Sequence, residues 1–334
     1  MAKPRVLVTR AIPDAGLDLV RAFCEADVWT DELPPERGVL LDRVKGVDGL
    51  LALLTDRIDP AVMDAAGPGL RVISNYAVGY DNVDVAEATR RGIPVGNTPG
   101  VLTDATADFA FTLLMAAARR VVEADRYTRA GRWRTWGPKL LLGQEISGTT
   151  LGIVGFGRIG SCMAHRASGF DMRVLYHNPE CEESTEAEAL GAECVDFDTL
   201  LREADFVSVH TPLTPATHHL FNEAAFARMK PTAILINTAR GPIVDPGALY
   251  RALESGTIAG AALDVTEPEP LPPESPLLGL DNIIVAPHIA SATRTARGKM
   301  ARMAAENLIA GLRRERLPNC VNPEVYTRLP GTRD

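Results

Sequence analysis

The stretch TTLGIVGFGRIGSCMAHRASGF, residues 149–170, decides the fold. It begins with a short apolar run typical of a buried strand and continues into a run with the amphipathic spacing of a helix. Gly155, Gly157 and Gly160 stand between them in a GxGxxG pattern. There the first glycine allows a tight turn, the second lets backbone approach a pyrophosphate, and the third lets the helix pack closely on the strand. The stretch therefore predicts the βα unit of a dinucleotide-binding domain.

The helix after these glycines offers N–H groups and a partial positive charge to a phosphate. Arg158 can add a charge-assisted hydrogen bond. We expect Arg158 and Ile159 to contact the cofactor together with the three glycines. A glycine-rich turn that serves packing alone is the alternative, and the strand–turn–helix context disfavours it.

The next strand ends in VLYHNPE, which bears on the choice of dinucleotide. An NAD site has an acidic residue there to bind the ribose 2′-hydroxyl, whereas an NADP site has an arginine nearby. His177 and Asn178 occupy the position instead, and no arginine is present. Three glutamates follow closely and would repel a 2′-phosphate, namely Glu180, Glu182 and Glu183. NAD(H) is therefore favoured as the cofactor, and NADP(H) stays possible.

Short apolar runs alternate with amphipathic runs along the whole chain, which is the pattern of parallel sheets covered by helices. Most of the apolar runs lack polar alternation, as strands buried on both faces do. We predict strands at Arg5–Thr9, Gly49–Leu54, Arg71–Ala77, Thr150–Gly155, Arg173–Tyr176, Phe206–His210, Ala233–Asn237, Ile258–Val265 and Ile283–Ala286.

Helices are predicted to begin near Pro13, Glu36 and Pro60, since proline is tolerated in a first turn. Two longer helical patterns, Thr103–Arg132 and Thr293–Arg314, are predicted to run between two domains and to act as hinges. The predicted fold class is α/β, with two Rossmann-like or flavodoxin-like domains, parallel sheets and an active-site cleft between the domains.

The composition excludes several classes of protein. The 334 residues are 46% hydrophobic and 23% charged, with a net charge of −8, so no electrostatic signature of a nucleic-acid or anionic-membrane partner is present. No leader-like segment stands at the N-terminus, and the expected location is cytoplasmic. Five scattered cysteines without a CxxC pair are expected to be reduced thiols, neither a disulfide framework nor a zinc site, and no metal site is predicted.

Six blocks in fixed order resemble the D-isomer-specific 2-hydroxyacid dehydrogenase family: NYAVGYDNVD, NTPGVLTDATADFA, GFGRIG, NTARGPIVD, ALDVTEPEP and APHIASAT. LLTDRID (53–59) and RWRTWGPKLLLG (132–143) are similar to glyoxylate/hydroxypyruvate reductases within that family. The resemblance implies that a nucleotide domain is inserted into a substrate domain. We place the substrate-binding domain at residues 1–100 and 289–334, and the dinucleotide-binding Rossmann domain at residues 101–288.

Reduction of a 2-keto acid needs a cation for the substrate carboxylate, an acid for the carbonyl oxygen and a partner for that acid. Arg240 and His288 each follow a predicted strand, at the edge where ligands bind in open α/β sheets. By resemblance, Arg240 binds the substrate, His288 donates the proton, and Glu269 stabilises the charged imidazolium. Glu267 is the less favoured register for that carboxylate. His165 and His218 are expected to be structural.

Further contacts are implied by the same resemblance. The backbone of Val78 and Gly79 is expected to bind the substrate carboxylate, and Leu54 and Trp136 to shape a pocket for a small substituent. In similar reductases a tryptophan in this context reaches the neighbouring subunit, which implies a homodimer. The remaining expected cofactor contacts are Thr106, His210, Thr211, Pro212, Thr238, Ala239, Asp264, which would bind the nicotinamide carboxamide, and Ala290.

The sequence thus predicts reduction of a small 2-keto acid such as glyoxylate or hydroxypyruvate. A phosphoglycerate dehydrogenase is an alternative, for which Arg57 is the one obvious extra cation. A phosphite dehydrogenase shares the Arg/Glu/His set. An NAD(H)-sensing binding protein of the corepressor kind is the alternative from another class, and measurable turnover would separate it from an enzyme.

Overall fold

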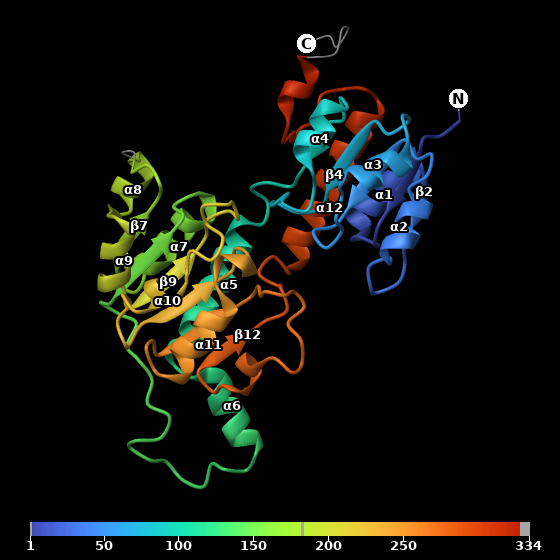
Figure 1. Ribbon diagram of the computed structural model, residues 1–334. Helices are drawn as coiled ribbons and strands as arrows, with labels where there is room; N and C mark the ends of the chain where they lie inside the picture. The colour runs from blue at the N-terminus through green and yellow to red at the C-terminus, as the bar shows by residue number, and fades with distance from the viewer. Residues whose placement is uncertain (1, 182–183, 328–334) are drawn as a thin grey trace. The chain divides into compact units, whose positions relative to one another are not determined.

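The computed structural model describes residues 2–181 and 184–327 of the chain. The chain divides into two compact units, Met1–Leu102 with Ala292–Asp334, and Thr103–Ser291. Each unit contains one sheet in which all neighbouring strands run parallel, with helices packed against it (Figure 1). The predicted α/β class is confirmed.

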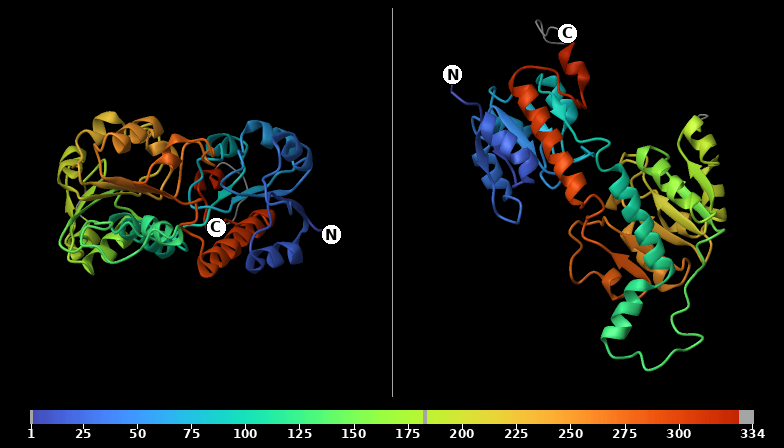
Figure 2. Two further views of the ribbon diagram at one scale, coloured as in Figure 1. Left: turned by 90° about the horizontal axis from the view of Figure 1, so that it is seen from below. Right: turned by 180° about the vertical axis from the view of Figure 1, so that it is seen from behind.

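The first unit has a five-stranded sheet in the order β2-β1-β3-β4-β5, which is the flavodoxin-like order. Its strands are β1 Arg5–Val8, β2 Glu25–Val28, β3 Gly49–Ala52, β4 Val72–Asn75 and β5 Val95–Gly96. Its helices are α1 Asp14–Phe23, α2 Arg37–Arg43, α3 Pro60–Ala66, α4 Val85–Arg90 and α12 Arg294–Leu312, with a 3₁₀ turn at Pro323–Tyr326. The long helix α12 packs on β3 and β4 and lies against α1 (Figures 1 and 2).

The second unit has a seven-stranded sheet in the order β12-β11-β10-β9-β6-β7-β8. Its strands are β6 Thr150–Val154, β7 Arg173–His177, β8 Glu193–Cys194, β9 Phe206–Val209, β10 Ile234–Asn237, β11 Gly260–Leu263 and β12 Ile283–Val285. Its helices are α5 Thr103–Ala118, α6 Val121–Arg129, α7 Arg158–Ser168, α8 Thr185–Ala189, α9 Phe197–Glu203, α10 Glu223–Phe226 and α11 Pro246–Glu254, with 3₁₀ turns at Gly241–Ile243 and Pro276–Gly279. Strands β7 and β8 are added on one side of β6, and strands β9 to β12 on the other side. The gap between the loops after β6 and β9 is therefore the topological switch point, and ligands are expected beside the carboxyl ends of these two strands.

The central strands of the second unit are buried on both faces. Leu235 packs into one hydrophobic cluster, whereas its neighbours Ile234 and Ile236 pack into another on the opposite face. Helices cover both faces, so every position of β9, β10 and β11 is buried. This double burial explains why these strands show no polar alternation in the sequence.

Three expectations from the sequence are wrong in detail. The single helix predicted over Thr103–Arg132 is two helices, because Arg120 adopts a left-handed conformation (φ 54°) and starts α6. The edge strands β2, β5 and β8 were not expected; two of them are only two residues long and carry little apolar signal.

The third correction concerns the cysteines. Cys181 and Cys194 form a disulfide with their Cα atoms 6.0 Å apart, so not all five thiols are reduced. Pairing of β7 with β8 places Cys194 opposite Tyr176, close to the loop that carries Cys181. The sequence separation of 13 residues matches no short cysteine motif, which is why the sequence did not reveal the pair. Cys24, Cys162 and Cys320 are free thiols.

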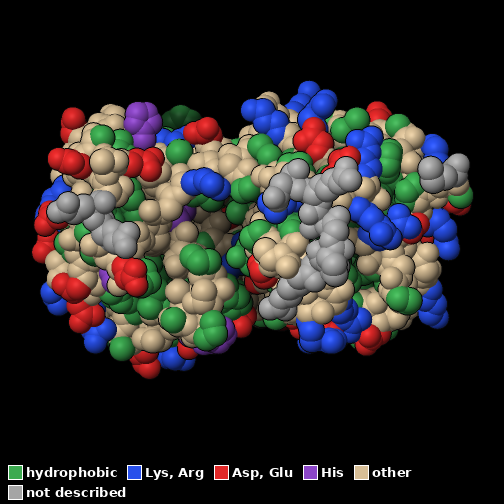
Figure 3. All heavy atoms as spheres, turned by 90° about the horizontal axis from the view of Figure 1, so that it is seen from above, with side chains coloured by type: hydrophobic (Ala, Val, Ile, Leu, Met, Phe, Trp, Pro, Cys, Tyr) green, Lys and Arg blue, Asp and Glu red, His purple; other side chains and the backbone are tan. Residues whose placement is uncertain are grey.

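Both signs of charge are scattered over the face drawn in Figure 3. No helix in the described ranges is long and apolar enough to cross a membrane.

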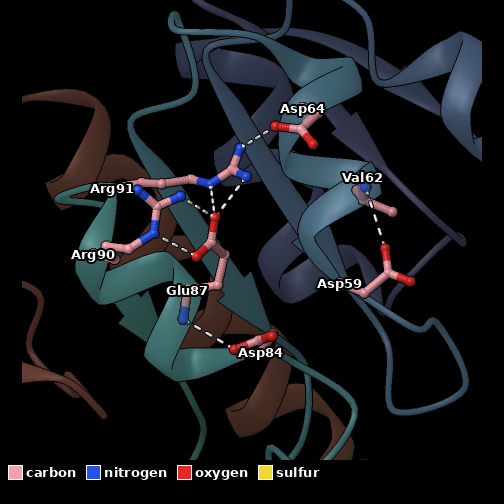
Figure 4. A network of polar contacts seen from close by, with 7 residues as sticks. All are labelled: Asp59, Val62, Asp64, Asp84, Glu87, Arg90 and Arg91. Atoms are coloured by element: carbon pink, nitrogen blue, oxygen red, sulfur yellow. Dashed lines mark hydrogen bonds and ion pairs between the residues drawn. The ribbon is translucent and has the colours of Figure 1, made fainter.

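A polar network ties α3 to α4 in the first unit (Figure 4). The carboxylate of Glu87 accepts hydrogen bonds from Arg90 and Arg91, and Arg91 also pairs with Asp64 of α3 at 2.8 Å. Asp59 and Asp84 cap the first turns of α3 and α4. The hydrogen bonds from Arg90 and Arg91 lower the pKa of Glu87 from 4.5 to about 2.

Replacing Glu87 with Gln should therefore lower the melting temperature at neutral pH. A carboxylate with a lowered pKa stabilises the fold above its unfolded value and loses that contribution as the pH falls through the folded value. The difference from wild type should shrink between pH 4.5 and about pH 2 in thermal melts followed by circular dichroism. Asp18→Asn, an exposed change on α1, is the control; an equal pH dependence in both variants would contradict the assignment.

Candidate functional site

The glycine turn after β6 has the close contacts that its three glycines predict. Gly155 has a φ of 98°, and a Cβ atom there would overlap the backbone of His210 and Thr211. A Cβ on Gly160 would overlap the carbonyl oxygen of Gly155, so α7 packs directly on the turn. A Cβ on Gly157 would meet nothing within 4 Å. The second glycine thus faces open space, which leaves room for a ligand at the backbone.

Two polar features beside this turn fit a dinucleotide. The N-terminus of α7, which begins at Arg158 and includes Ile159, has no side-chain cap, so its first N–H groups suit an anion. Thr238, at the end of β10, has a buried hydroxyl that finds no hydrogen-bond partner within residues 2–181 and 184–327. Buried hydroxyls are nearly always paired in proteins, and a bound ligand would satisfy this one.

The end of β7 is held by its own side chains. His177 Nδ1 lies 3.1 Å from the carbonyl oxygen of Val195, and Asn178 Oδ1 accepts the amide N–H of Phe156 at 2.8 Å. Asn178 therefore links this strand end to the glycine turn. Glu180 follows in the loop, while Glu182 and Glu183 lie outside the described residues.

His210, Thr211 and Pro212 follow β9 and form the turn against which Gly155 packs. His210 lies 2.8 Å from the hydroxyl of Ser208, and burial lowers its pKa from 6.5 to about 4. A neutral ring at physiological pH is suited to a position next to a cofactor and unsuited to acting as the catalytic acid.

The ends of β10, β11 and β12 meet at the same edge of the sheet. Asn237 pairs with Leu263, and Leu263 pairs with Val285, so the residues after these strands are neighbours. The side chain of Asn237 accepts the amide N–H of Ala239 and donates to the carbonyl oxygen of Arg240, which folds the turn that carries Arg240. The three loops after β10, β11 and β12 contain Arg240, Glu269 and His288 respectively.

Asp264, directly after β11, fixes the position of the loop after β12. Its carboxylate accepts the amide N–H groups of Ile289 and Ala290, both at 2.7 Å, and its carbonyl oxygen accepts the amide of His288. Burial raises the pKa of Asp264 above its usual range, while the two amide hydrogen bonds oppose that rise. Asp264 and Ala290 are thus joined by a hydrogen bond of their own, without a cofactor.

His288 and Glu269 form a hydrogen bond of 2.6 Å between Nδ1 and Oε1. His288 adopts a φ of 55°, a left-handed conformation that costs on the order of 1–3 kcal/mol for a residue other than glycine. With Nδ1 directed at the carboxylate, Nε2 is the ring atom left for proton transfer. Glu267, two residues earlier in this loop, contacts His219 instead.

The loops of Arg240 and Glu269 are in direct contact. A Cβ on Gly241 would overlap the carbonyl group of Thr266, so only glycine fits beside Arg240. Thr266 in turn donates its amide N–H to Glu269 at 3.4 Å. The backbone that carries the guanidinium therefore lies against the backbone that carries the carboxylate.

In the first unit, the segment of Val78 and Gly79 presents its amides outward. The carbonyl oxygens of Val78 and Gly79 accept from the side chains of Asn97 and Asn75, and that of Ala77 accepts the amide of Thr98. In a trans peptide the N–H points away from the carbonyl, so the amides of Val78 and Gly79 face the opposite side. Among the described residues neither amide has a partner, as an anion-binding backbone requires.

The remaining predicted residues lie elsewhere. Leu54 is partly exposed in the turn after β3, and Thr106 is buried within α5. Trp136 is 78% exposed in a segment without helix or strand that follows α6 and stands away from the sheet (Figure 2).

One cluster was not predicted. His218, His219 and Glu267 place ligand-type atoms within 4.8 Å of one another. The two histidines are adjacent and Glu267 stands 48 residues away from His219, so no spaced motif could have revealed the group.

A glycine turn at the switch point of a parallel sheet, with a histidine–carboxylate pair on the same sheet edge, is the arrangement of a dinucleotide-dependent oxidoreductase. Comparisons with known proteins agree. Residues 111–290 match the family model described as "D-isomer specific 2-hydroxyacid dehydrogenase, NAD binding domain". A glyoxylate reductase of Korarchaeum cryptofilum is 58% identical, over 98% of this chain and 99% of that protein.

Solved structures are also similar. A Thermus thermophilus protein matches with a TM-score of 0.89 and 50% identity, covering 95% of this chain and 99% of that one. An NADPH-dependent glyoxylate/hydroxypyruvate reductase of Sinorhizobium meliloti, in complex with NADP and malonate, matches with a TM-score of 0.84 and 32% identity, covering 99% and 100%. This chain belongs to the D-isomer specific 2-hydroxyacid dehydrogenase family and uses a nicotinamide cofactor.

Two alanine substitutions should separate packing from cofactor binding. Gly241→Ala forces a methyl group into the Thr266 carbonyl and should destabilise the fold by about 1–3 kcal/mol, measured by urea unfolding. Gly157→Ala places its methyl group in open space and should leave stability unchanged while weakening NADH binding, measured by fluorescence titration. Full NADH affinity in Gly157→Ala would argue against a pyrophosphate at this turn.

Proposed function

We propose that this protein reduces glyoxylate, hydroxypyruvate and similarly small 2-keto acids to the 2-hydroxy acids. The observation that carries the proposal is the hydrogen bond between His288 and Glu269, on the sheet edge that also holds Arg240 and the glycine turn. Relatives that share more than half of their residues with this chain are named glyoxylate reductase, which supports the choice of substrate.

In the proposed reaction each side chain has one task. Arg240 binds the substrate carboxylate and polarises the carbonyl, since its planar guanidinium can donate two parallel hydrogen bonds. A nicotinamide bound at the glycine turn would supply the hydride for the carbonyl carbon. His288 donates the Nε2 proton to the carbonyl oxygen, so that one hydride and one proton convert the carbonyl group to an alcohol. Glu269 orients the ring and stabilises its charged form. The amides of Val78 and Gly79 are proposed as further donors to the carboxylate.

The charges of the first unit support a small, unphosphorylated substrate. Arg57, the extra cation that a phosphate would need, is 84% exposed and lies 3.4 Å from Asp59. The Asp59 carboxylate beside this guanidinium would repel a phosphate dianion, so Arg57 is a poor sole partner for one. Leu54 and Trp136 are proposed to limit the size of the substituent on the keto acid.

NAD(H) is proposed as the preferred cofactor. Asn178 is bonded to the glycine turn, and Glu180 would face a 2′-phosphate in the loop that follows. Contacts to the cofactor are proposed for the glycine turn with Arg158 and Ile159, and for His177, the His210–Thr211–Pro212 turn, Thr106, Thr238, Ala239, Asp264 and Ala290.

We also propose that two copies of this chain associate through α6 and the segment that follows it. No residue of α6 is buried, and Val121, Trp133, Trp136 and Leu142 are all more than half exposed. A cavity of about 620 Å³ next to α6 is lined by Tyr127 and Leu142 together with charged residues such as Arg126. Exposed tryptophan, leucine and valine side chains beside such a cavity are typical of an interface, and a second copy would cover them.

The cytoplasm is the proposed location, since the reaction draws on a cellular pool of nicotinamide dinucleotide. The Cys181–Cys194 disulfide bears on this proposal because disulfides rarely persist in the reducing cytosol of mesophiles. Trapping of thiols by alkylation in intact cells would show whether the bond exists there.

Removing the acid should lower turnover strongly and leave cofactor binding unchanged. His288→Ala is expected to lower kcat for glyoxylate with NADH by about 10²–10⁴-fold, since general acid catalysis contributes that much. Arg240→Ala should raise KM for glyoxylate as well as lower kcat. Both variants should bind NADH as wild type does, because neither residue is proposed to contact it. Near-wild-type turnover by His288→Ala would end the assignment.

A steady-state panel tests the substrate and cofactor proposals together. Glyoxylate and hydroxypyruvate should give a higher kcat/KM than pyruvate or 3-phosphohydroxypyruvate, and NADH a higher value than NADPH. Phosphite oxidation with NAD at a comparable rate would favour a phosphite dehydrogenase, and no turnover of any compound would favour a sensor.

Association through α6 predicts a particle of twice the 35.9 kDa chain mass in light scattering coupled to size exclusion. Val121→Asp combined with Leu142→Asp places charges on the exposed apolar surface and should yield monomers. Leu33→Asp, which alters an equally exposed leucine of the first unit, should leave the dimer intact. A dimer that persists in the double variant would refute this interface.

A further inference from the structure

A small cluster of potential metal ligands lies beside the loop that carries Glu269. His218 and His219 stack with their ring centroids 4.0 Å apart, and Nε2 of His219 lies 2.7 Å from Oε2 of Glu267. One ligand atom from each of the three side chains falls within 4.8 Å of the other two.

Two of these three groups are already fixed in place. The backbone N–H of His219 donates to Pro242 at 2.8 Å, and its carbonyl oxygen accepts from Asn222. His219 also has a φ of 50°, a strained conformation of the kind that clusters at ligand-binding positions. Glu267 belongs to the loop that packs on Gly241. His218 is exposed, so its ring can rotate without disturbing the core.

We propose that His218, His219 and Glu267 bind a divalent transition-metal ion, with Zn²⁺ as the representative. Two imidazoles and one carboxylate form a three-ligand set that zinc completes with water. Metal–ligand distances of about 2.0–2.2 Å place tetrahedral ligand atoms roughly 3.3–3.6 Å apart. The His219–Glu267 contact must open slightly to reach that spacing, and rotation of His218 brings in the third ligand. Mg²⁺ and Ca²⁺ are disfavoured because they select oxygen ligands.

Metal binding at this cluster would act on the catalytic loop. The ion takes the place of the hydrogen between Nε2 of His219 and Oε2 of Glu267, and the neutral ring then carries its proton on Nδ1. Glu267 then moves away from its present contact, two residues before Glu269 in the same loop. This effect on turnover rests on the function proposed above, whereas the metal site itself does not.

The site is tested by titrating the full-length protein, free of any histidine tag, with Co²⁺ and following visible absorption, and with Zn²⁺ by calorimetry. We expect one ion per chain with a tetrahedral Co²⁺ spectrum. His218→Asn and Glu267→Gln should each weaken affinity by at least about 10-fold. His218 is exposed, so its variant tests the site even if Glu267→Gln fails to fold.

Two matched controls exclude general surface binding. His165→Asn on α7 and Glu274→Gln in the same proline-rich loop alter exposed residues outside the cluster and should leave affinity unchanged. No Co²⁺ spectrum, or equal affinity in wild type and His218→Asn, would overturn the site and leave His219–Glu267 as a plain hydrogen-bonded pair.

Turnover gives a separate readout. Zn²⁺ should lower kcat of wild type more than it changes KM, and should not do so in His218→Asn. Binding without an effect on kcat would overturn only the coupling to Glu269. Because the Co²⁺ spectrum needs neither substrate nor cofactor, it stays informative even if the proposed reductase activity fails.

Discussion

The carboxylate of Asp264 accepts the backbone N–H groups of Ile289 and Ala290, and this pair of hydrogen bonds fixes the segment that carries His288. Asp264 follows the central strand β11, whereas Ile289 and Ala290 follow the edge strand β12. The contact therefore joins two loops that strand pairing alone would leave independent. Charge-assisted hydrogen bonds of this kind contribute about 1.5–3 kcal/mol each, which offsets part of the cost of burying the carboxylate. The left-handed conformation of His288 is sustained because Asp264 accepts the amides of His288, Ile289 and Ala290, which fixes the backbone on both sides of the His288 Cα atom.

From that anchor the candidate site is built by contacts between neighbouring loops. Gly241 lies against Thr266, Thr266 donates to Glu269, and Glu269 bonds to His288. Strand β6, which leads into the glycine turn, belongs to the same sheet. His210 follows the neighbouring strand β9, packs against that turn and is kept neutral by burial. Two histidines in different environments therefore lie at the same edge of the sheet: His210 is neutral, and His288 lies beside the carboxylate of Glu269. Separate environments for separate protonation states are what acid catalysis next to a cofactor requires.

The features of this site that depend on local sequence patterns could be predicted from the sequence. Buried parallel strands leave long apolar runs, and the glycine turn has a fixed spacing, so both were predictable. The break at Arg120 was not, because nothing in the local pattern marks a left-handed residue there. The Cys181–Cys194 bond and the His219–Glu267 contact depend on which strands and loops become neighbours in the fold. The spacing of these residues along the chain does not indicate which segments become neighbours. The family resemblance alone favoured Glu269 over Glu267, and the hydrogen bond from Glu269 to His288 agrees with that choice.

Proton transfer in the proposed reaction depends most on the direction in which His288 presents its ring. Nitrogen-15 NMR of imidazole-labelled protein, with His288→Ala used to assign the resonance, measures the tautomer of the neutral ring. The hydrogen bond to Glu269 predicts a proton on Nδ1 in wild type and a shift toward the Nε2-protonated form, preferred by free histidine, in Glu269→Ala. A wild-type ring protonated on Nε2 and unaffected by the loss of Glu269 would contradict the account.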